Sequence, residues 1–233
     1  MPKRYWWVIL TYIVAQLSVL IFAPLLFNVF PLTEIQAIVY WNIISFVAAL
    51  LIIIRLMKQD LTEKKHRGAA GHVGIVIWSI IGFILSWIAQ VIAVNIEISV
   101  FGIEPGSENT AIIMEIAKQT PIFLLIPVLI APILEELIFR KIIFGTLYKR
   151  MNFVFAAFLS ALIFGIIHQE PEHILIYSSM GFVFAFLYVQ TKRIIVPIIV
   201  HMALNTASVI VQLTFDIEKL EQLQTLIFTF GGL

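Results

Sequence analysis

The sequence predicts an all-α polytopic membrane protein, a bundle of seven to eight transmembrane helices with a cytoplasmic N-terminus. Of its 233 residues, 61% are hydrophobic and only 12% are charged, and the mean hydropathy is +1.02. A soluble domain of this length carries about twice that charge, so a water-soluble globular protein is excluded. Apolar runs close to the ~20 residues that cross a bilayer recur along the chain, which indicates many crossings.

Seven apolar runs, separated by charge clusters, predict the membrane helices at residues 6–30, 35–54, 73–94, 120–143, 153–167, 174–189 and 194–213. The first run is too long for a signal-peptide core and has no small-residue cleavage site, so a retained helix is expected. An eighth run, residues 225–233, is too short to span alone and predicts an interfacial or partly inserted end. Without an internal repeat or a low-complexity linker, one membrane domain is expected. Its parts are an N-terminal three-helix part (1–119), a membrane core (120–213) and a tail or partial eighth helix (214–233).

The basic residues predict the orientation of these helices. They lie before the first run and after the second, fourth and sixth runs, at Lys3, Arg4, Arg55, Lys58, Lys64, Lys65, Arg67, Arg140, Lys141, Lys149, Arg150, Lys192 and Arg193. The opposite side has only Lys118 and Lys219. Because Lys and Arg near helix ends stay on the cytoplasmic side, this alternation places the N-terminus inside. The net charge of +1 indicates neither a nucleic acid nor a generally acidic partner.

A few polar side chains occur within the apolar runs, where each is a functional candidate because burying it in lipid is costly. They are Glu135 and Glu136 in the fourth run, His168 at the end of the fifth, and His201 and Asn205 in the seventh. Side chains four residues apart share one face of a helix. Phe164 therefore lies beneath His168, and His201 lies over Asn205. Three helices are predicted to converge on one site.

The same spacing separates the two glutamates. Glu136 lies over Arg140 and can form an ion pair with it, which predicts a structural role. Glu135 lies over Phe139 and has no partner on its own helix. It must find one on another helix or in water, which makes Glu135 the better general base.

Two prolines, Pro127 and Pro132, indicate an irregular backbone beside the glutamates. Each removes a backbone donor and leaves a carbonyl, of Phe123 and Val128 respectively, without its helical partner. Within a bilayer such a break is tolerated only against protein or a water-filled cavity. Water at this position is the reagent that a hydrolase requires.

Depth along the predicted helices agrees only partly with one site. At about 1.5 Å per residue from the cytoplasmic ends, Glu135 lies about 12 Å deep and His201 about 10 Å, whereas His168 lies about 22 Å deep. The hairpin of the fifth and sixth runs is therefore expected to tilt or to end within the membrane. The shallow positions of Glu135 and His201 favour access from the cytoplasm or from the lipid. Tyr177 is interpreted as an interfacial aromatic residue.

Elimination narrows the chemistry of such a site. The chain has no cysteine, no His-Glu-x-x-His and no Gly-x-Ser-x-Gly, and both aspartates lie in predicted loops. What remains is a water polarised by Glu135 and His168, with His201 and Asn205 donating hydrogen bonds to the developing oxyanion. Zinc held by Glu135, His168 and His201 stays open, because carboxylate and imidazole are ordinary zinc ligands. A proton-coupled transporter or a non-proteolytic immunity scaffold that uses the same cluster is the alternative class.

Together, three motifs resemble a known family: Glu135-Glu136-x-x-x-Arg140, Phe164-x-x-x-His168 and His201-x-x-x-Asn205. In this order they are similar to the signature motifs of the CPBP family, which comprises type II CAAX prenyl endopeptidases and the bacterial Abi or bacteriocin-immunity proteins. The resemblance covers about residues 121–211. One departure is Lys141, since a glycine commonly follows the motif arginine.

The resemblance implies a glutamate-dependent endopeptidase in the bacterial cell membrane, acting on CAAX-like, lipidated or hydrophobic peptides or proteins and contacting lipid but no nucleic acid. It assigns water activation to Glu135 and His168, and the oxyanion hole to His201 with Asn205. Glu136, Arg140 and Phe164 are implied as structural support. No cofactor is implied.

Overall fold

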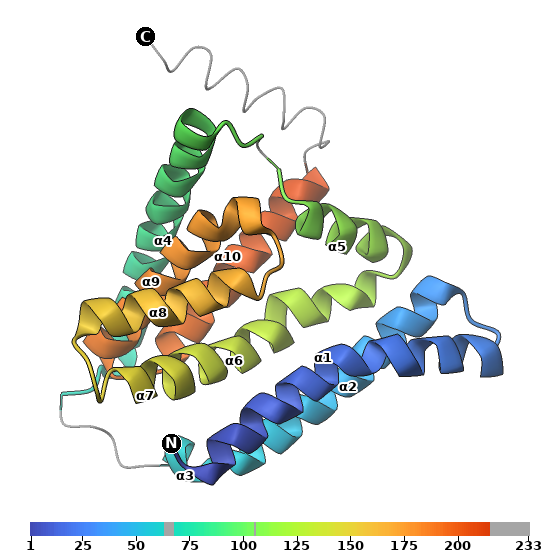
Figure 1. Ribbon diagram of the computed structural model, residues 1–233, viewed down its shortest axis with the longest axis horizontal. Coiled ribbons are helices and arrows are strands. Elements are labelled where there is room, and N and C mark those ends of the chain that lie inside the picture. The colour runs from blue at the N-terminus through green and yellow to red at the C-terminus, as the bar shows by residue number, and fades with distance from the viewer. Residues whose placement is uncertain (63–67, 105, 215–233) are drawn as a thin grey trace.

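The computed structural model describes residues 1–62, 68–104 and 106–214, and this part of the chain contains helices and no strand (Figure 1). The long helices are α1 (Lys3–Val29), α2 (Glu34–Leu56), α4 (His72–Phe101), α9 (Ile174–Thr191) and α10 (Ile195–Thr214). Shorter ones are α3 (Lys58–Thr62), α5 (Glu108–Gln119), α7 (Gly145–Leu147) and α8 (Phe153–Ile166). The all-α membrane fold is confirmed, because six helical segments are long and apolar enough to cross a bilayer.

Helices α1 and α2 lie side by side as a hairpin (Figure 1). A capping box starts α2: the Thr33 hydroxyl accepts from the Gln36 amide (3.2 Å), and the Gln36 side chain accepts from the Thr33 amide (3.0 Å). At the other end of the hairpin, Arg4 and Tyr5 donate to Asp60 of α3 at 2.9 and 2.7 Å. The hairpin then packs its buried face against residues 126–142, and Val8, Ile53 and Leu134 in this layer are fully buried.

The segment at 121–147 is a single span that changes helical type several times. It runs through η1 (Pro121–Leu124), η2 (Ile126–Ile130), α6 (Ala131–Glu136), η3 (Leu137–Phe144) and α7, with η2 and η3 as π-helices. In η2 the Ala131 amide reaches back five residues to the Ile126 carbonyl. Prolines and π-bulges both interrupt the ordinary four-residue ladder, so the irregular backbone predicted beside Pro127 and Pro132 is confirmed.

Helices α8 and α9 approach closely because small residues line their contact. A Cβ added to Gly181 would lie 3.1 Å from the Ala161 backbone, and one added to Gly165 would lie 2.6 Å from the Ser178 hydroxyl. Without a hydrophobic driving force between helices in lipid, close backbone approach of this kind is a main source of helix association. Helix α4 covers the other side of α9 and α10, and Gly82 fits against Leu187.

The expected number of crossings and the cytoplasmic N-terminus stay predictions. Helix α8, in the fifth predicted run, has 14 residues and is too short to cross on its own. The eighth predicted segment, residues 225–233, lies outside the described residues. Helix α5 was not expected from the apolar pattern, because its polar face interrupts the run, and Ser107 caps it by accepting from the Thr110 amide at 3.1 Å.

Candidate active site

Glu136 and Arg140 are completely buried on one helical face and form the expected ion pair. Glu136 Oε2 and Arg140 Nε are 3.0 Å apart. Their angles do not make a hydrogen bond, and the other guanidinium nitrogens have no hydrogen-bond partner among the described residues. Aromatic rings take their place: the guanidinium carbon lies 4.5 Å from the Phe164 centroid and 5.2 Å from that of Phe184. Charge attraction and the negative ring faces therefore hold Arg140.

His201 lies between the two glutamates. Its Nδ1 is 3.1 Å from Glu136 Oε1, and its Nε2 is 3.7 Å from Glu135 Oε2. The ring stacks on Phe184 with centroids 5.0 Å apart, which fixes its plane. Since a carboxylate only accepts, Nδ1 carries a proton that it donates to Glu136. The fourth and seventh predicted runs therefore meet at His201, as expected.

His168 lies in the turn after α8 with its ring held on three sides. Its Nδ1 is 2.7 Å from the Phe164 carbonyl, and its ring packs edge-on against Phe164 (4.6 Å) and stacks on Tyr177 (4.0 Å). A carbonyl can only accept, so Nδ1 carries the hydrogen and neutral His168 keeps its lone pair at Nε2. The predicted packing of Phe164 beneath this histidine is confirmed.

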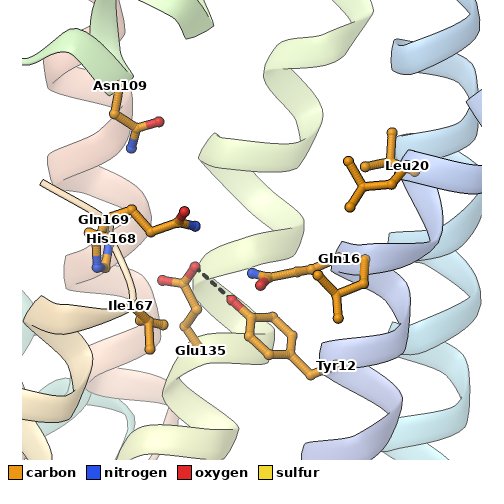
Figure 2. A pocket seen from close by; sticks show the side chains of 10 residues that line it. Tyr12, Gln16, Leu20, Asn109, Glu135, Ile167, His168 and Gln169 are labelled. Atoms are coloured by element: carbon orange, nitrogen blue, oxygen red, sulfur yellow. Dashed lines mark hydrogen bonds between the residues drawn. The ribbon is translucent and has the colours of Figure 1, made fainter.

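A cavity of about 440 Å³ brings Glu135 and His168 to one surface (Figure 2). One wall is α1, from Tyr12 to Leu20, and the other is formed by Glu135, Asn109 of α5 and the turn at residues 167–169. The Glu135 side chain is 13% exposed, so it can meet water or substrate there. Along α1 the cavity extends away from the N-terminal end, and Leu20 is 72% exposed.

Asn205 is not among the residues that line the cavity, and its side chain is engaged with the backbone. Its Nδ2 donates to the Pro127 carbonyl at 2.8 Å. In the five-residue register of η2, the donor for this carbonyl falls on Pro132, which has no N–H. The sequence predicted that the Val128 carbonyl would lack its backbone donor. In the π-turn the carbonyl without a backbone donor is that of Pro127, one residue earlier. Asn205 keeps a second Nδ2 hydrogen for another acceptor.

Tyr12 is a site residue that the sequence reasoning missed. It is buried on α1, and its hydroxyl lies 3.3 Å from Glu135 Oε1. In the sequence it is one aromatic residue in an apolar run 123 positions before Glu135, so no local signal marks it. The spatial partner that Glu135 required comes from the N-terminal hairpin as well as from His201.

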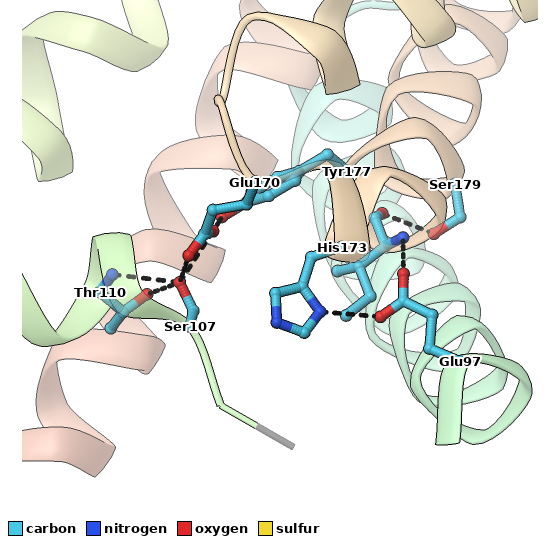
Figure 3. A network of polar contacts seen from close by, with 8 residues as sticks. Glu97, Ser107, Thr110, Glu170, His173, Tyr177 and Ser179 are labelled. Atoms are coloured by element: carbon cyan, nitrogen blue, oxygen red, sulfur yellow. Dashed lines mark hydrogen bonds and ion pairs between the residues drawn. The ribbon is translucent and has the colours of Figure 1, made fainter. Parts of the chain in front are cut away.

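Tyr177 is the second missed residue, because its ring stacks on His168. Its hydroxyl donates to Glu170, which also accepts from the Ser107 hydroxyl (3.0 Å) and the Asn109 amide (2.8 Å) (Figure 3). Partial burial acts to raise the pKa of Glu170, but these three hydrogen bonds outweigh it and hold the pKa below its ordinary value. Glu170 thus ties α5 to the turn that carries His168.

A second buried acid fixes the same turn to α4. Glu97 is 2% exposed and pairs with His173 Nδ1 at 2.9 Å, and its other oxygen accepts from the Ile176 amide at 3.2 Å (Figure 3). The start of α9 is held by these contacts. As for metals, no group of three acidic, histidine or cysteine side chains within residues 1–62, 68–104 and 106–214 is arranged to hold one.

The helical membrane fold encloses a buried polar cluster, and the similar proteins show that its class is a multi-pass membrane peptidase. Residues 117–207 match the family model described as type II CAAX prenyl endopeptidase Rce1-like. YdiL of Bacillus subtilis strain 168, assigned as a membrane peptidase, is 43% identical over 242 residues, which covers 100% of this chain and 99% of YdiL. MroQ of Staphylococcus aureus strain USA300, a membrane-embedded CAAX protease, is 34% identical over 223 residues, 90% of each chain. The chain belongs to this family of membrane-embedded CAAX-type peptidases. No solved structure matches the chain.

Proposed function

We propose that this membrane endopeptidase hydrolyses its substrate with a water molecule activated by Glu135 and His168. The observation that carries the proposal is the cavity of Figure 2, where both side chains reach one surface. Glu135 is the carboxylate in that lining, and it faces Tyr12 and His201 rather than an arginine. His168 presents Nε2 as an acceptor, because Nδ1 is bound to the Phe164 carbonyl.

In the proposed reaction Glu135 takes a proton from the water as its oxygen attacks the peptide carbonyl. His168 accepts the second hydrogen bond of that water and so orients it. His201 is held by Glu136 through Nδ1, and in its imidazolium form it donates to the oxyanion from Nε2, together with the remaining Nδ2 hydrogen of Asn205. Glu135 then returns the proton to the leaving amine, the C–N bond breaks, and a carboxylic acid and an amine are released.

Glu136, Arg140 and Phe164 support this arrangement without touching the reacting atoms. Arg140 neutralises Glu136. The Phe164 ring centroid lies 4.5 Å from the guanidinium carbon of Arg140, and 4.6 and 5.9 Å from the ring centroids of His168 and His201. We propose a membrane-associated peptide with an apolar or lipidated segment as the substrate. The relative MroQ is named as a CAAX protease, and apolar side chains of α1 line one wall of the cavity.

The test compares the wild type with Glu135→Gln in lipid nanodiscs, on a panel of blocked hydrophobic peptides with and without a prenylated C-terminal cysteine. General base catalysis contributes about 10²–10⁴-fold, so the variant is expected to lose at least about 100-fold in kcat/KM. Glu115→Gln is the matched control, since this exposed residue of α5 lies outside the cavity. Equal cleavage by Glu135→Gln would refute the mechanism, and cleavage of the prenylated peptides alone would select a CAAX-like substrate.

A further inference from the structure

Three side-chain amides line the cavity, each from a different segment of the chain. Gln16 projects from α1, Asn109 from the start of α5 and Gln169 from the turn after His168 (Figure 2). The backbone amides of Asn109 and Gln169 already donate to Glu170 and to the Ile166 carbonyl, so contacts with a bound molecule fall to the two side chains. Gln16 and Gln169 are exposed and Asn109 is half-buried, so a molecule in the cavity can reach their donor and acceptor groups.

Gln169 has a left-handed backbone conformation in the turn that follows α8. Its φ is +60°, in the left-handed region that glycine, asparagine and aspartate tolerate better than glutamine. This conformation directs the amide into the cavity and toward Glu135 (Figure 2). Strain of this kind persists at positions where the surrounding structure holds it, and such positions cluster at functional sites.

The chemistry of the lining defines what it binds. An amide offers both a donor and an acceptor, which is the same pair that each peptide unit presents. None of the ten lining residues is Lys or Arg, so no cation attracts an anionic ligand. Beside Gln16, the α1 wall presents the apolar side chains Leu17, Val19 and Leu20.

We propose that the cavity binds an uncharged, extended peptide segment through its backbone, and that Gln169 is the substrate-contacting residue nearest to Glu135. Gln16 and Asn109 pair with the peptide units that follow, and the α1 wall takes the apolar side chains. The site recognises its ligand through the hydrogen-bonding groups of the peptide backbone and not through a particular side chain. This inference rests on the proposed function, because it places the substrate of that reaction.

Gln169→Gly removes the amide and at the same time relieves the positive φ, which separates binding from stability. The fluorescent probe is a blocked, uncharged hydrophobic octapeptide, and its affinity is measured in the Glu135→Gln background, where no cleavage interferes. Gln169→Gly is expected to bind it about five- to tenfold more weakly, as loss of a hydrogen bond predicts, with an unchanged or higher melting temperature. Gln169→Asn keeps an amide in a residue that tolerates this φ, and it is expected to stay within about threefold of the parent.

Lys192→Gly is the matched control, since Lys192 is the other described non-glycine residue with positive φ (+53°) and lies outside the cavity lining. It is expected to leave peptide affinity unchanged. A second measurement uses the same octapeptide with N-methylated backbone amides, which should bind more weakly to the parent but equally to parent and Gln169→Gly. Unchanged affinity in Gln169→Gly, or an equal loss in Lys192→Gly, overturns the inference. Because binding is measured without cleavage, failure of the proposed reaction is scored separately by kcat/KM.

Discussion

Replacing Arg140 by methionine removes the guanidinium that pairs with Glu136 and leaves that carboxylate fully buried. Methionine is long and apolar, so it fills much of the space between Phe164 and Phe184. The loss in free energy of unfolding is therefore largely electrostatic. Breaking a buried ion pair by removing one partner costs about 3–5 kcal/mol. At 1.36 kcal/mol per factor of ten, the unfolding equilibrium shifts by about 10²–10⁴-fold.

The assay is unfolding in mixed micelles titrated with dodecyl sulfate, followed by the fluorescence of the five tryptophans. Glu136→Gln combined with Arg140→Met removes both charges and is expected to recover most of the lost free energy of unfolding, since replacing a whole buried pair is often neutral. A loss below about 1 kcal/mol in Arg140→Met would show that solvent or another group compensates Glu136. A double variant as unstable as the single variant would show that packing, not charge, holds the arginine.

Three further perturbations test other parts of the site. Tyr12→Phe removes the 3.3 Å hydrogen bond to Glu135 and should lower kcat/KM about two- to tenfold without unfolding the protein, as peptide cleavage and circular dichroism will show. Glu170→Gln should flatten the acid dependence of stability, because a carboxylate with a lowered folded-state pKa contributes stability above its ordinary value of 4.5 and loses it as the pH falls through the folded-state value. Gly181→Val should force α8 and α9 apart and abolish folding or activity, whereas Gly71→Ala, with open space around its Cβ position, should be silent in thermal melts.

Wild-type kcat/KM in Tyr12→Phe would mean that α1 does not act on Glu135. Parallel melting curves for wild type and Glu170→Gln between pH 6 and pH 3 would mean that another acid controls the turn. A Gly181→Val protein with normal melting and cleavage would show that α8 and α9 can separate without disturbing Phe164.

The sequence was enough to predict the residues of the core cluster, because their spacing is local. Glu136 with Arg140 and Phe164 with His168 are four residues apart, and helical geometry alone brings each pair together. The interruption at Pro127 and Pro132 was equally local, since proline has no amide hydrogen wherever it stands. Its consequence shifted by one residue because a π-turn, which no sequence pattern announced, changed the register.

The missed residues are those whose meaning depends on distant partners. Tyr12 reaches Glu135 only because the α1–α2 hairpin packs on residues 126–142, and helix packing is not encoded in any short window. Tyr177 resembled any aromatic residue near a helix end, and only the fold places it behind His168. Access from the cytoplasm or from the lipid stays a prediction, and the structure adds that α1 forms one wall of the cavity.

The placement of Glu136 and Arg140 on adjacent turns of one helix has a consequence for how the protein is made. The segment that carries them can enter the bilayer with this pair already neutralised, before any other helix arrives. His201, the contact between the two glutamates, is synthesised later, and at 5–20 residues per second the chain from residue 140 to 201 takes roughly 3–12 s. Until then Glu135 and Glu136 lack this imidazole. The order of synthesis therefore keeps the nascent peptidase incomplete until its last described helix has been inserted.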